Sequence, residues 1–226
     1  MYHFGVLRMK TTIYLVRHCQ ASGNVTGRFQ GHTNGTVSEL GLHQLKCLEQ
    51  KFKAIHIDKI YSSPLDRAYM TAQAIGRGCG VSDITKDEQL IEICGGNLEN
   101  HTPEEMAEID PVQSSNWFNA FHLFEPVGGE STVQVYNRMK RAIDRIVAEN
   151  EGLSIAIASH GCAIRCLLCA IKGLTLEQID CLGWVENTGV CVVEYENGVY
   201  NVLCENDVSH YDEYLQNKRQ ALWFAK

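Results

Sequence analysis

The stretch TTIYLVRHCQASGN, residues 11–24, is where the prediction of the fold begins. Its first seven residues form a mainly apolar run of the kind found in strands that are covered on both faces. Arg17 and His18 then stand side by side where the strand ends. In open α/β sheets, ligands bind just beyond the carboxyl ends of the strands. These two residues are therefore candidates for a functional site.

Strands and helices alternate along the rest of the chain. Further strands are expected at 58–63 and 152–160, and amphipathic helices at 38–55, 63–78 and 131–150, the first two capped by Ser38 and Ser63. The segment 189–206 predicts a hairpin that turns at Glu196-Asn197-Gly198 and forms an edge of the sheet. The alternation predicts a three-layer α/β fold, with a mostly parallel sheet and helices on both faces.

The length of 226 residues favours a single domain over residues 1–226. Residues 1–10 are expected to be an N-terminal extension. Residues 94–130 lack a clean hydrophobic period and are expected to form a small helical lid insertion. Its aromatic residues Trp117, Phe118, Phe121 and Phe124 either favour a ring-bearing leaving group or pack as the core of the lid itself.

The composition restricts the classes of function. A net charge of −7 argues against general binding to nucleic acid or to an anionic membrane. The sequence contains no apolar run long enough to span a bilayer and no signal-peptide pattern, so a cytoplasmic location is expected. There are 10 cysteines; Cys162, Cys166 and Cys169 fall at helical spacing and are expected to pack in the core rather than to bind metal.

Polar residues follow three of the predicted strands. Arg17 and His18 follow the first, Arg67 lies on the helix after the second, and His160 follows the strand at 152–160. Parallel strands bring these ends to one edge of the sheet. Two guanidinium groups and two imidazoles in one small volume suit a phosphate, because guanidinium donors pair with its oxygens bidentately.

The chain resembles the histidine phosphatase superfamily, in the phosphoglycerate-mutase-like branch, from about Thr12 to about Cys204. The resemblance is carried by five segments in the family's order: LVRHCQASGN, YSSPLDRAYMTAQAI, LIEICGGNLEN, VGGEST and SHGCAIRCLL. The resemblance implies a phosphoglycerate mutase-like fold. It also implies metal-independent and cofactor-free phosphoryl transfer through a phosphohistidine.

The resemblance further implies a role for each matching residue. His18 is the expected nucleophile, and Glu92 the acid that protonates the leaving alcohol and then deprotonates water. Arg17, Arg67 and His160 are expected to bind the phosphoryl oxygens and stabilise the transition state, together with the phosphate-binding Asn24 and Gln30. The arginines are expected to neutralise the charge that magnesium neutralises in other phosphoryl-transfer enzymes, and the sequence shows no metal-ligand cluster, so no metal is expected.

Two departures from the family pattern stand out. Cys19 occupies a position where the family usually has Gly, which raises the hypothesis of a reactive thiol with a lowered pKa beside the arginines. Near Leu98 the family usually has an aromatic residue followed by Glu-Gly, whereas this chain has Glu99-Asn100. Packing in that segment is expected to differ.

A phosphatase is preferred to a mutase. The stretch GRFQGHT, residues 27–33, resembles phosphatase members and supplies Gln30, and residues 93–130 contain no Lys or Arg to hold a substrate carboxylate. The expected activity is hydrolysis of a small phosphorylated metabolite. The alternatives are a cofactor-dependent phosphoglycerate mutase and a non-catalytic phospho-ligand binding protein. A homodimer formed through the edge hairpin or the carboxyl end, LWFAK, is also considered.

Overall fold

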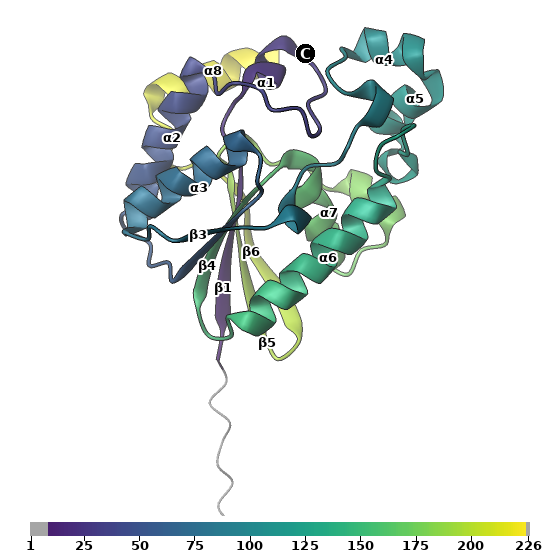
Figure 1. Cartoon of the computed structure of the whole chain (residues 1–226). Helices are drawn as coiled ribbons and strands as arrows, with labels where there is room; N and C mark the ends of the chain where they lie inside the picture. The colour runs from purple at the N-terminus through teal and green to yellow at the C-terminus, as the bar shows by residue number, and fades with distance from the viewer. Residues whose placement is uncertain (1–8, 225–226) are drawn as a thin grey trace, which may run out of the picture.

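A computed structural model describes the backbone over residues 9–224 and the side chains as far as Arg219 (Figure 1). The expected N-terminal extension therefore lies outside the described residues, apart from Met9 and Lys10. The side chains of LWFAK also lie outside them.

A mixed six-stranded sheet forms the centre of the molecule, and its strands follow the order β3-β2-β4-β1-β5-β6. The strands are β1 (Thr11–Arg17), β2 (Lys59–Ser62), β3 (Ile84–Lys86), β4 (Ser154–Ser159), β5 (Val190–Glu196) and β6 (Val199–Asp207). The first four are parallel, whereas β5 and β6 form an antiparallel hairpin on β1. Arg17 pairs with Ser159, so β1 and β4 end together. The predicted α/β fold is confirmed.

Helices cover both faces of the sheet (Figure 1). Helices α2 (Glu39–Phe52) and α3 (Asp66–Cys79) pack on one face, and α6 (Thr132–Glu149) and α7 (Gly161–Ile171) pack on the other. Strand β1 is apolar on both faces because each face contacts a different helical layer. Ile13 and Leu15 join the core beneath α6 and α7, and Val16 joins the core beneath α2 and α3. This double coverage holds Arg17 and His18 at the strand end.

The predicted caps are correct for one of the two helices. Ser38 is the N-cap of α2 and accepts a hydrogen bond from the backbone N–H of Gly41 at 3.0 Å. The prediction for Ser63 is wrong, because α3 begins only at Asp66 and its N-cap is Leu65. The Ser63 hydroxyl instead contacts His160.

The segment 94–130, called the lid below, is helical as predicted. It contains α4 (Pro103–Ile109) and α5 (Pro111–Asn119), and short 3₁₀ helices at Gly96–Leu98 and Phe121–Leu123. Each α-helix begins with Pro in the first turn after a side-chain cap, which the sequence patterns TPEE and DPVQ encode. The remaining helices are α1 (Ser22–Thr26), α8 (Glu213–Phe224) and the 3₁₀ turns Glu88–Leu90 and Leu176–Cys181.

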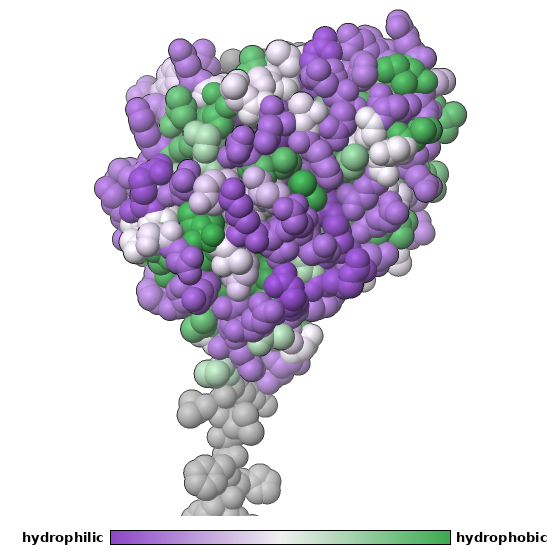
Figure 2. All heavy atoms as spheres, viewed as in Figure 1, coloured by the Kyte–Doolittle hydropathy of each residue, from purple (hydrophilic) through white to green (hydrophobic). Residues whose placement is uncertain are grey.

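The hairpin of β5 and β6 forms one edge of the sheet, which confirms that prediction. Asn197 and Gly198 both have positive φ, as a two-residue hairpin turn of this hand requires. Cys162, Cys166 and Cys169 of α7 are buried in the core, as expected. Within residues 9–224, the structure contains no helix long and apolar enough to cross a membrane. Figure 2 shows hydrophobic residues scattered among hydrophilic ones on the face in view.

Candidate active site

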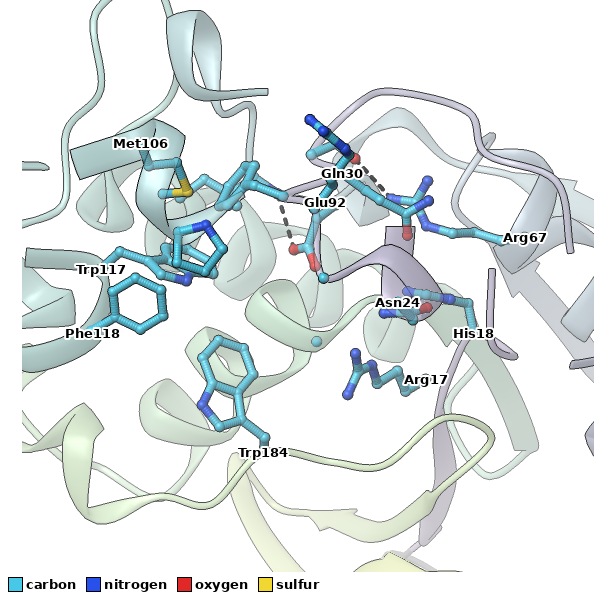
Figure 3. A pocket seen from close by; sticks show the side chains of 17 residues that line it. Arg17, His18, Asn24, Gln30, Arg67, Glu92, Met106, Trp117, Phe118 and Trp184 are labelled. Atoms are coloured by element: carbon cyan, nitrogen blue, oxygen red, sulfur yellow. Dashed lines mark hydrogen bonds between the residues drawn. The ribbon is translucent and has the colours of Figure 1, made fainter. Parts of the chain in front are cut away.

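A cavity of about 220 Å³ lies at the carboxyl ends of β1 and β4 (Figure 3). Six of the seven predicted site residues line it: Arg17, His18, Asn24, Gln30, Arg67 and Glu92. The seventh, His160, lies directly behind His18, with 5.1 Å between the ring centroids. The structure therefore brings together residues that the sequence places in five separate segments.

Hydrogen bonds fix both the backbone and the side chain of His18. The backbone N–H of His18 donates to the carbonyl of Ser159 at 2.9 Å, which ties the end of β1 to β4. Nδ1 lies 2.7 Å from the Cys19 carbonyl, an acceptor, so Nδ1 carries the proton and Nε2 keeps a free electron pair. Burial lowers the pKa of His18 well below its ordinary value, and the charges of Arg67 and Arg17 lower it further. His18 is therefore a neutral imidazole at pH 7.

Two arginines flank His18: Arg67, which is buried, and Arg17, which is half-buried. Arg17 donates from Nη1 to the Val185 carbonyl at 2.6 Å, and Arg67 donates to the carbonyls of Gly31 at 2.7 Å and Thr33 at 2.9 Å. The Nε atoms of both arginines are buried and have no hydrogen-bond partner among the described residues. Buried donors are normally paired. Two fixed cations with free donors therefore suit a phosphate group.

His160 and Ser63 form the back of the site. His160 is fully buried, and its Nε2 lies 2.7 Å from the Ser63 hydroxyl oxygen. Its Nδ1 has no partner within the described part of the chain. Burial, followed by the charge of Arg67, lowers the pKa of His160 well below the ordinary histidine value. Ser63 is thus part of the site, although the sequence suggested only a helix cap.

Asn24 and Gln30 complete the polar lining. The Asn24 side-chain oxygen accepts the backbone N–H of Ala21 at 3.1 Å, so its amide N–H groups remain available as donors beside His18 (Figure 3). Gln30 lines the cavity near Glu92 and Arg67 in the same view.

Glu92 is positioned by the N-terminus of α7. One carboxylate oxygen accepts from the backbone N–H groups of Ile93 and Ala163, both at 3.0 Å, and the other accepts from Cys162 at 3.2 Å. The N–H groups in the first turn of a helix have no partner inside the helix, so a carboxylate at this place satisfies them. The three bonds fix Glu92 in the cavity lining between the arginines and the aromatic residues (Figure 3).

Arg138 of α6 holds the backbone that carries Glu92. It donates from Nε and Nη2 to the two carboxylate oxygens of Glu130, at 2.7 and 2.8 Å, and to the carbonyls of Gln89 at 2.9 Å and Glu92 at 3.0 Å. This buried arginine is a positioning residue that the sequence analysis missed. Glu130 lies in the VGGEST segment, whose role the structure thereby explains.

The loop at residues 27–33, called the phosphate loop below, is tied to the start of the lid. The Glu99 carboxylate accepts from the backbone N–H groups of His32 at 2.7 Å, Thr33 at 3.0 Å and Gly95 at 3.0 Å. Asn100 has a positive φ of 61° at the position where the family usually has Gly, a conformation that Asn tolerates. This local change therefore preserves the turn.

The phosphate loop also contacts the first helix of the lid. Arg28 donates to Glu105 at 2.8 and 3.3 Å, and the backbone of Phe29 exchanges hydrogen bonds with Asn100 and His101. Glu105 also accepts the Thr102 N–H at 3.0 Å as part of the α4 capping box. Arg28 is therefore a paired cation at the rim of the cavity.

Aromatic side chains divide into two groups in the lid. Phe121 and Phe124 are buried in its core, whereas Trp117 and Phe118 line the cavity. Trp184, from the loop before β5, lines the cavity from another side (Figure 3). Trp184 was not predicted from the sequence, because an isolated aromatic residue in a loop belongs to no periodic pattern.

The reactive-thiol hypothesis for Cys19 is wrong. Its side chain is fully buried, and burial raises its pKa to about 11 despite the neighbouring Arg67. Cys19 is also absent from the described residues with positive φ, so the position does not need the conformational freedom of glycine. Cys19 packs with Leu45 and Ala74 as a small core residue.

One cluster of potential metal ligands lies outside the cavity lining, within the described residues. His43 and Cys47 are one turn apart on α2, and Asp212 lies 2.6 Å from His43 Nε2. The separation of 169 residues between His43 and Asp212 hid this cluster from sequence analysis. None of the three lines the cavity, and the expectation of metal-free catalysis stays a prediction.

A buried histidine, two fixed arginines and a carboxylate at the strand ends of an α/β sheet form an arrangement suited to phosphoryl transfer. The family model of the histidine phosphatase superfamily, branch 1, matches residues 13–208. The chain therefore belongs to this superfamily, as the resemblance implied.

Named relatives support the same assignment. The chain is 31% identical to phosphoserine phosphatase 1 of Hydrogenobacter thermophilus, over 93% of this chain and 99% of that protein. It is 31% identical to a probable phosphoglycerate mutase GpmB of Proteus mirabilis, over 88% and 94% respectively. The solved structure of Bacillus stearothermophilus YhfR superposes with a TM-score of 0.84 at 33% identity, covering 88% of this chain and 98% of the other. The family and these relatives support an enzyme that hydrolyses phosphomonoesters, and they support phosphoglycerate mutase activity less strongly.

Proposed function

We propose that the enzyme hydrolyses phosphomonoesters of small molecules, with His18 as nucleophile and Glu92 as acid and base. The observation that supports this most is the hydrogen bond from His18 Nδ1 to the Cys19 carbonyl, which leaves the electron pair of Nε2 free for attack. Nε2 forms a bond to phosphorus while the bond from phosphorus to the ester oxygen breaks. Protonated Glu92 gives its proton to the leaving alcohol oxygen.

In the second step water replaces the alcohol. Glu92, now a carboxylate, takes a proton from water, and the resulting hydroxide attacks phosphorus as the bond to Nε2 breaks. Phosphate leaves, and His18 and protonated Glu92 are restored. The donors that face the phosphoryl group, on Arg17, Arg67 and Asn24, stabilise the charge that spreads over its oxygens in both steps, and His160 supports them from behind.

The cations that line the cavity favour hydrolysis over the mutase reaction. They are Arg17, Arg28 and Arg67, and Glu105 already pairs with Arg28. Arg17 and Arg67 lie at the phosphate end. A mutase must also hold the carboxylate of its phosphoglycerate, and no unpaired cation among the described lining residues meets that need.

Phosphate release from a panel of phosphomonoesters tests the proposal. We expect release in the presence of EDTA, loss of release in His18→Ala, and a phosphorylated wild-type enzyme that is stable to alkali and labile to acid. Isomerisation of 3-phosphoglycerate without net release, measured with 2,3-bisphosphoglycerate present, would identify a mutase. Turnover that survives in His18→Ala would reject His18 as nucleophile.

We propose that the enzyme is cytoplasmic. The ten cysteines are free, which suits a reducing compartment.

We also propose that two copies of the chain form a homodimer through the edge hairpin. The edge strand β6 exposes Val199 and Leu203, whose apolar surface an antiparallel strand of the second copy can cover. Sedimentation of the wild type as a dimer and of Leu203→Lys as a monomer is expected, and a monomeric wild type rejects the pairing.

A further inference from the structure

The end of the cavity opposite the arginines has an apolar wall. Figure 3 places Met106, Trp117 and Phe118 together on the side away from His18, with Trp184 next to them, and the ring centroids of Trp117 and Trp184 are 5.9 Å apart. Phe118 is 57% exposed and Trp184 is 43% exposed, although both are large apolar side chains. Exposed aromatic surface beside a cavity is typical of a ligand-binding face.

We propose that this enzyme prefers phosphomonoesters whose alcohol carries an apolar planar ring over esters whose alcohol carries a carboxylate and an ammonium group. The inference rests on the proposed function and adds the class of leaving group. Trp117, Phe118 and Trp184 form the wall that contacts the ring, called the ring wall below.

Trp117 belongs both to the lid core and to the ring wall. Its ring packs edge-on against Phe29 at 4.6 Å between centroids and against Phe124 at 4.9 Å. These contacts fix the orientation of the indole, and the remaining surface lines the cavity. A ring that is already fixed loses little conformational entropy when a ligand binds.

Trp184 is supported from behind by Arg165. The guanidinium carbon lies 4.7 Å from the Trp184 ring centroid, within the range of a cation–π contact. Arg165 is buried and donates to the Leu182 carbonyl and to Asp180, both at 3.1 Å. It therefore stacks on the indole and is held away from the cavity, which leaves Trp184 free to contact a ligand.

The ring wall offers no free cation to a carboxylate. Arg28 lies at the rim of the cavity, and Glu105 neutralises it. Residues 93–130 contain no Lys or Arg. A substrate carboxylate at this end would lose water without gaining a free cation, which is unfavourable. An uncharged ring loses nothing comparable and gains aromatic contacts.

Three primary alkyl phosphates test the proposal: 2-phenylethyl phosphate, ethyl phosphate and O-phospho-L-serine. The first two have leaving alcohols of similar acidity, so the ratio of their kcat/KM values reports ring binding. We expect 2-phenylethyl phosphate to exceed ethyl phosphate at least about tenfold, and phosphoserine to fall below both.

Variants locate the effect on the ring wall. Phe118→Ala and Trp184→Ala should each reduce the ratio of 2-phenylethyl to ethyl phosphate by about fivefold or more. Val112→Ala is the matched control, because Val112 is 63% exposed on the same lid helix as Phe118 and does not line the cavity. Its ratio should equal that of the wild type. Phe118→Arg should raise kcat/KM for phosphoserine.

The outcomes separate this inference from the proposed function. Turnover of phosphoserine above 2-phenylethyl phosphate, or an unchanged ratio in both alanine variants, overturns the ring preference and leaves hydrolysis intact. If the wild type hydrolyses none of the three esters, the proposed function fails. Binding of 2-phenylethylphosphonate and ethylphosphonate then decides the ring preference, and equal dissociation constants reject it.

Discussion

The two ends of the cavity are built in different ways. At the phosphate end, His18, Arg67 and His160 are almost fully buried, and backbone carbonyls or a buried hydroxyl hold them at the ends of strands and at the start of a helix. The other end, called the alcohol end below, is the one that would contact the leaving alcohol. There Phe118 and Trp184 are partly exposed, and they come from the lid and from a loop. The comparison shows that this fold fixes the groups that act on phosphorus and leaves the groups that contact the alcohol on segments free to vary.

Removing the nucleophile gives the largest expected change. His18→Ala should lower kcat on every ester by about 10⁴-fold or more, because the neighbouring imidazole, His160, lies behind His18 with its Nε2 against the Ser63 hydroxyl and cannot replace the nucleophile. His56→Ala, at an exposed histidine outside the cavity, is the control. Phosphate release measured at matched protein concentration checks this. If binding of 2-phenylethylphosphonate disappears together with turnover, the two ends are not separable and the comparison fails.

Changing the acid sharpens the comparison, because Glu92 lies between the two ends. Glu92→Gln should lower kcat about 10²- to 10³-fold for 2-phenylethyl phosphate, whose alkoxide needs a proton. The loss should be about tenfold for 4-nitrophenyl phosphate, whose leaving group needs none. Glu108→Gln, at an exposed residue of α4, should match the wild type. Equal losses on both esters would contradict the role of Glu92 as acid.

Arg138 is expected to contribute to the stability of the folded protein near the buried phosphate end of the cavity. Arg138→Leu leaves Glu130 without its partner at a site where both side chains are mostly buried. We expect the free energy of unfolding to fall by about 3 kcal/mol, measured by urea titration. Arg77→Leu breaks the more exposed pair with Glu49 and should cost less than about 1 kcal/mol. Similar losses in both variants would show that Arg138 is not a buried anchor.

The buried histidines also predict a pH dependence of stability. Burial lowers the pKa values of His18 and His160, and it lowers the pKa of His210 to about 4, so the folded state resists protonation at pH values where the unfolded chain accepts protons. Stability should therefore fall as pH drops below about 6.5, by up to about 4 kcal/mol per pH unit for three protons. Urea titrations between pH 7.5 and 5.5 measure the slope. His18→Ala should reduce it by about a third, and an unchanged slope would show that His18 is protonated in the folded state.

Sequence alone predicted the phosphate end well, because the fold ties it to strong local patterns. The buried run that ends in Arg17 and His18 specifies a strand and its carboxyl end, and parallel pairing places His160 beside it. Ser63 was misassigned because a hydroxyl before a helix reads as a cap until its contact with His160 is visible.

The alcohol end was harder to predict. Trp184 and Arg165 act through a stacking contact between separate segments, and no sequence spacing reports such a contact. Residues 94–130 look aperiodic, and their short helices are encoded by caps rather than by hydrophobic repeats. For the same reason the lid aromatics were not separable into core and ring-wall residues before their burial was known.

The Glu105 carboxylate has a consequence for dynamics. It caps α4 and holds Arg28 of the phosphate loop, so the lid helix and the loop that carries Gln30 share one anchor. A displacement of α4 that breaks this anchor releases the Arg28 end of the phosphate loop, whereas the Glu99 carboxylate still holds His32 and Thr33. Motion of the lid helix is therefore coupled to one end of the phosphate loop, and the other end keeps its separate tie to the start of the lid.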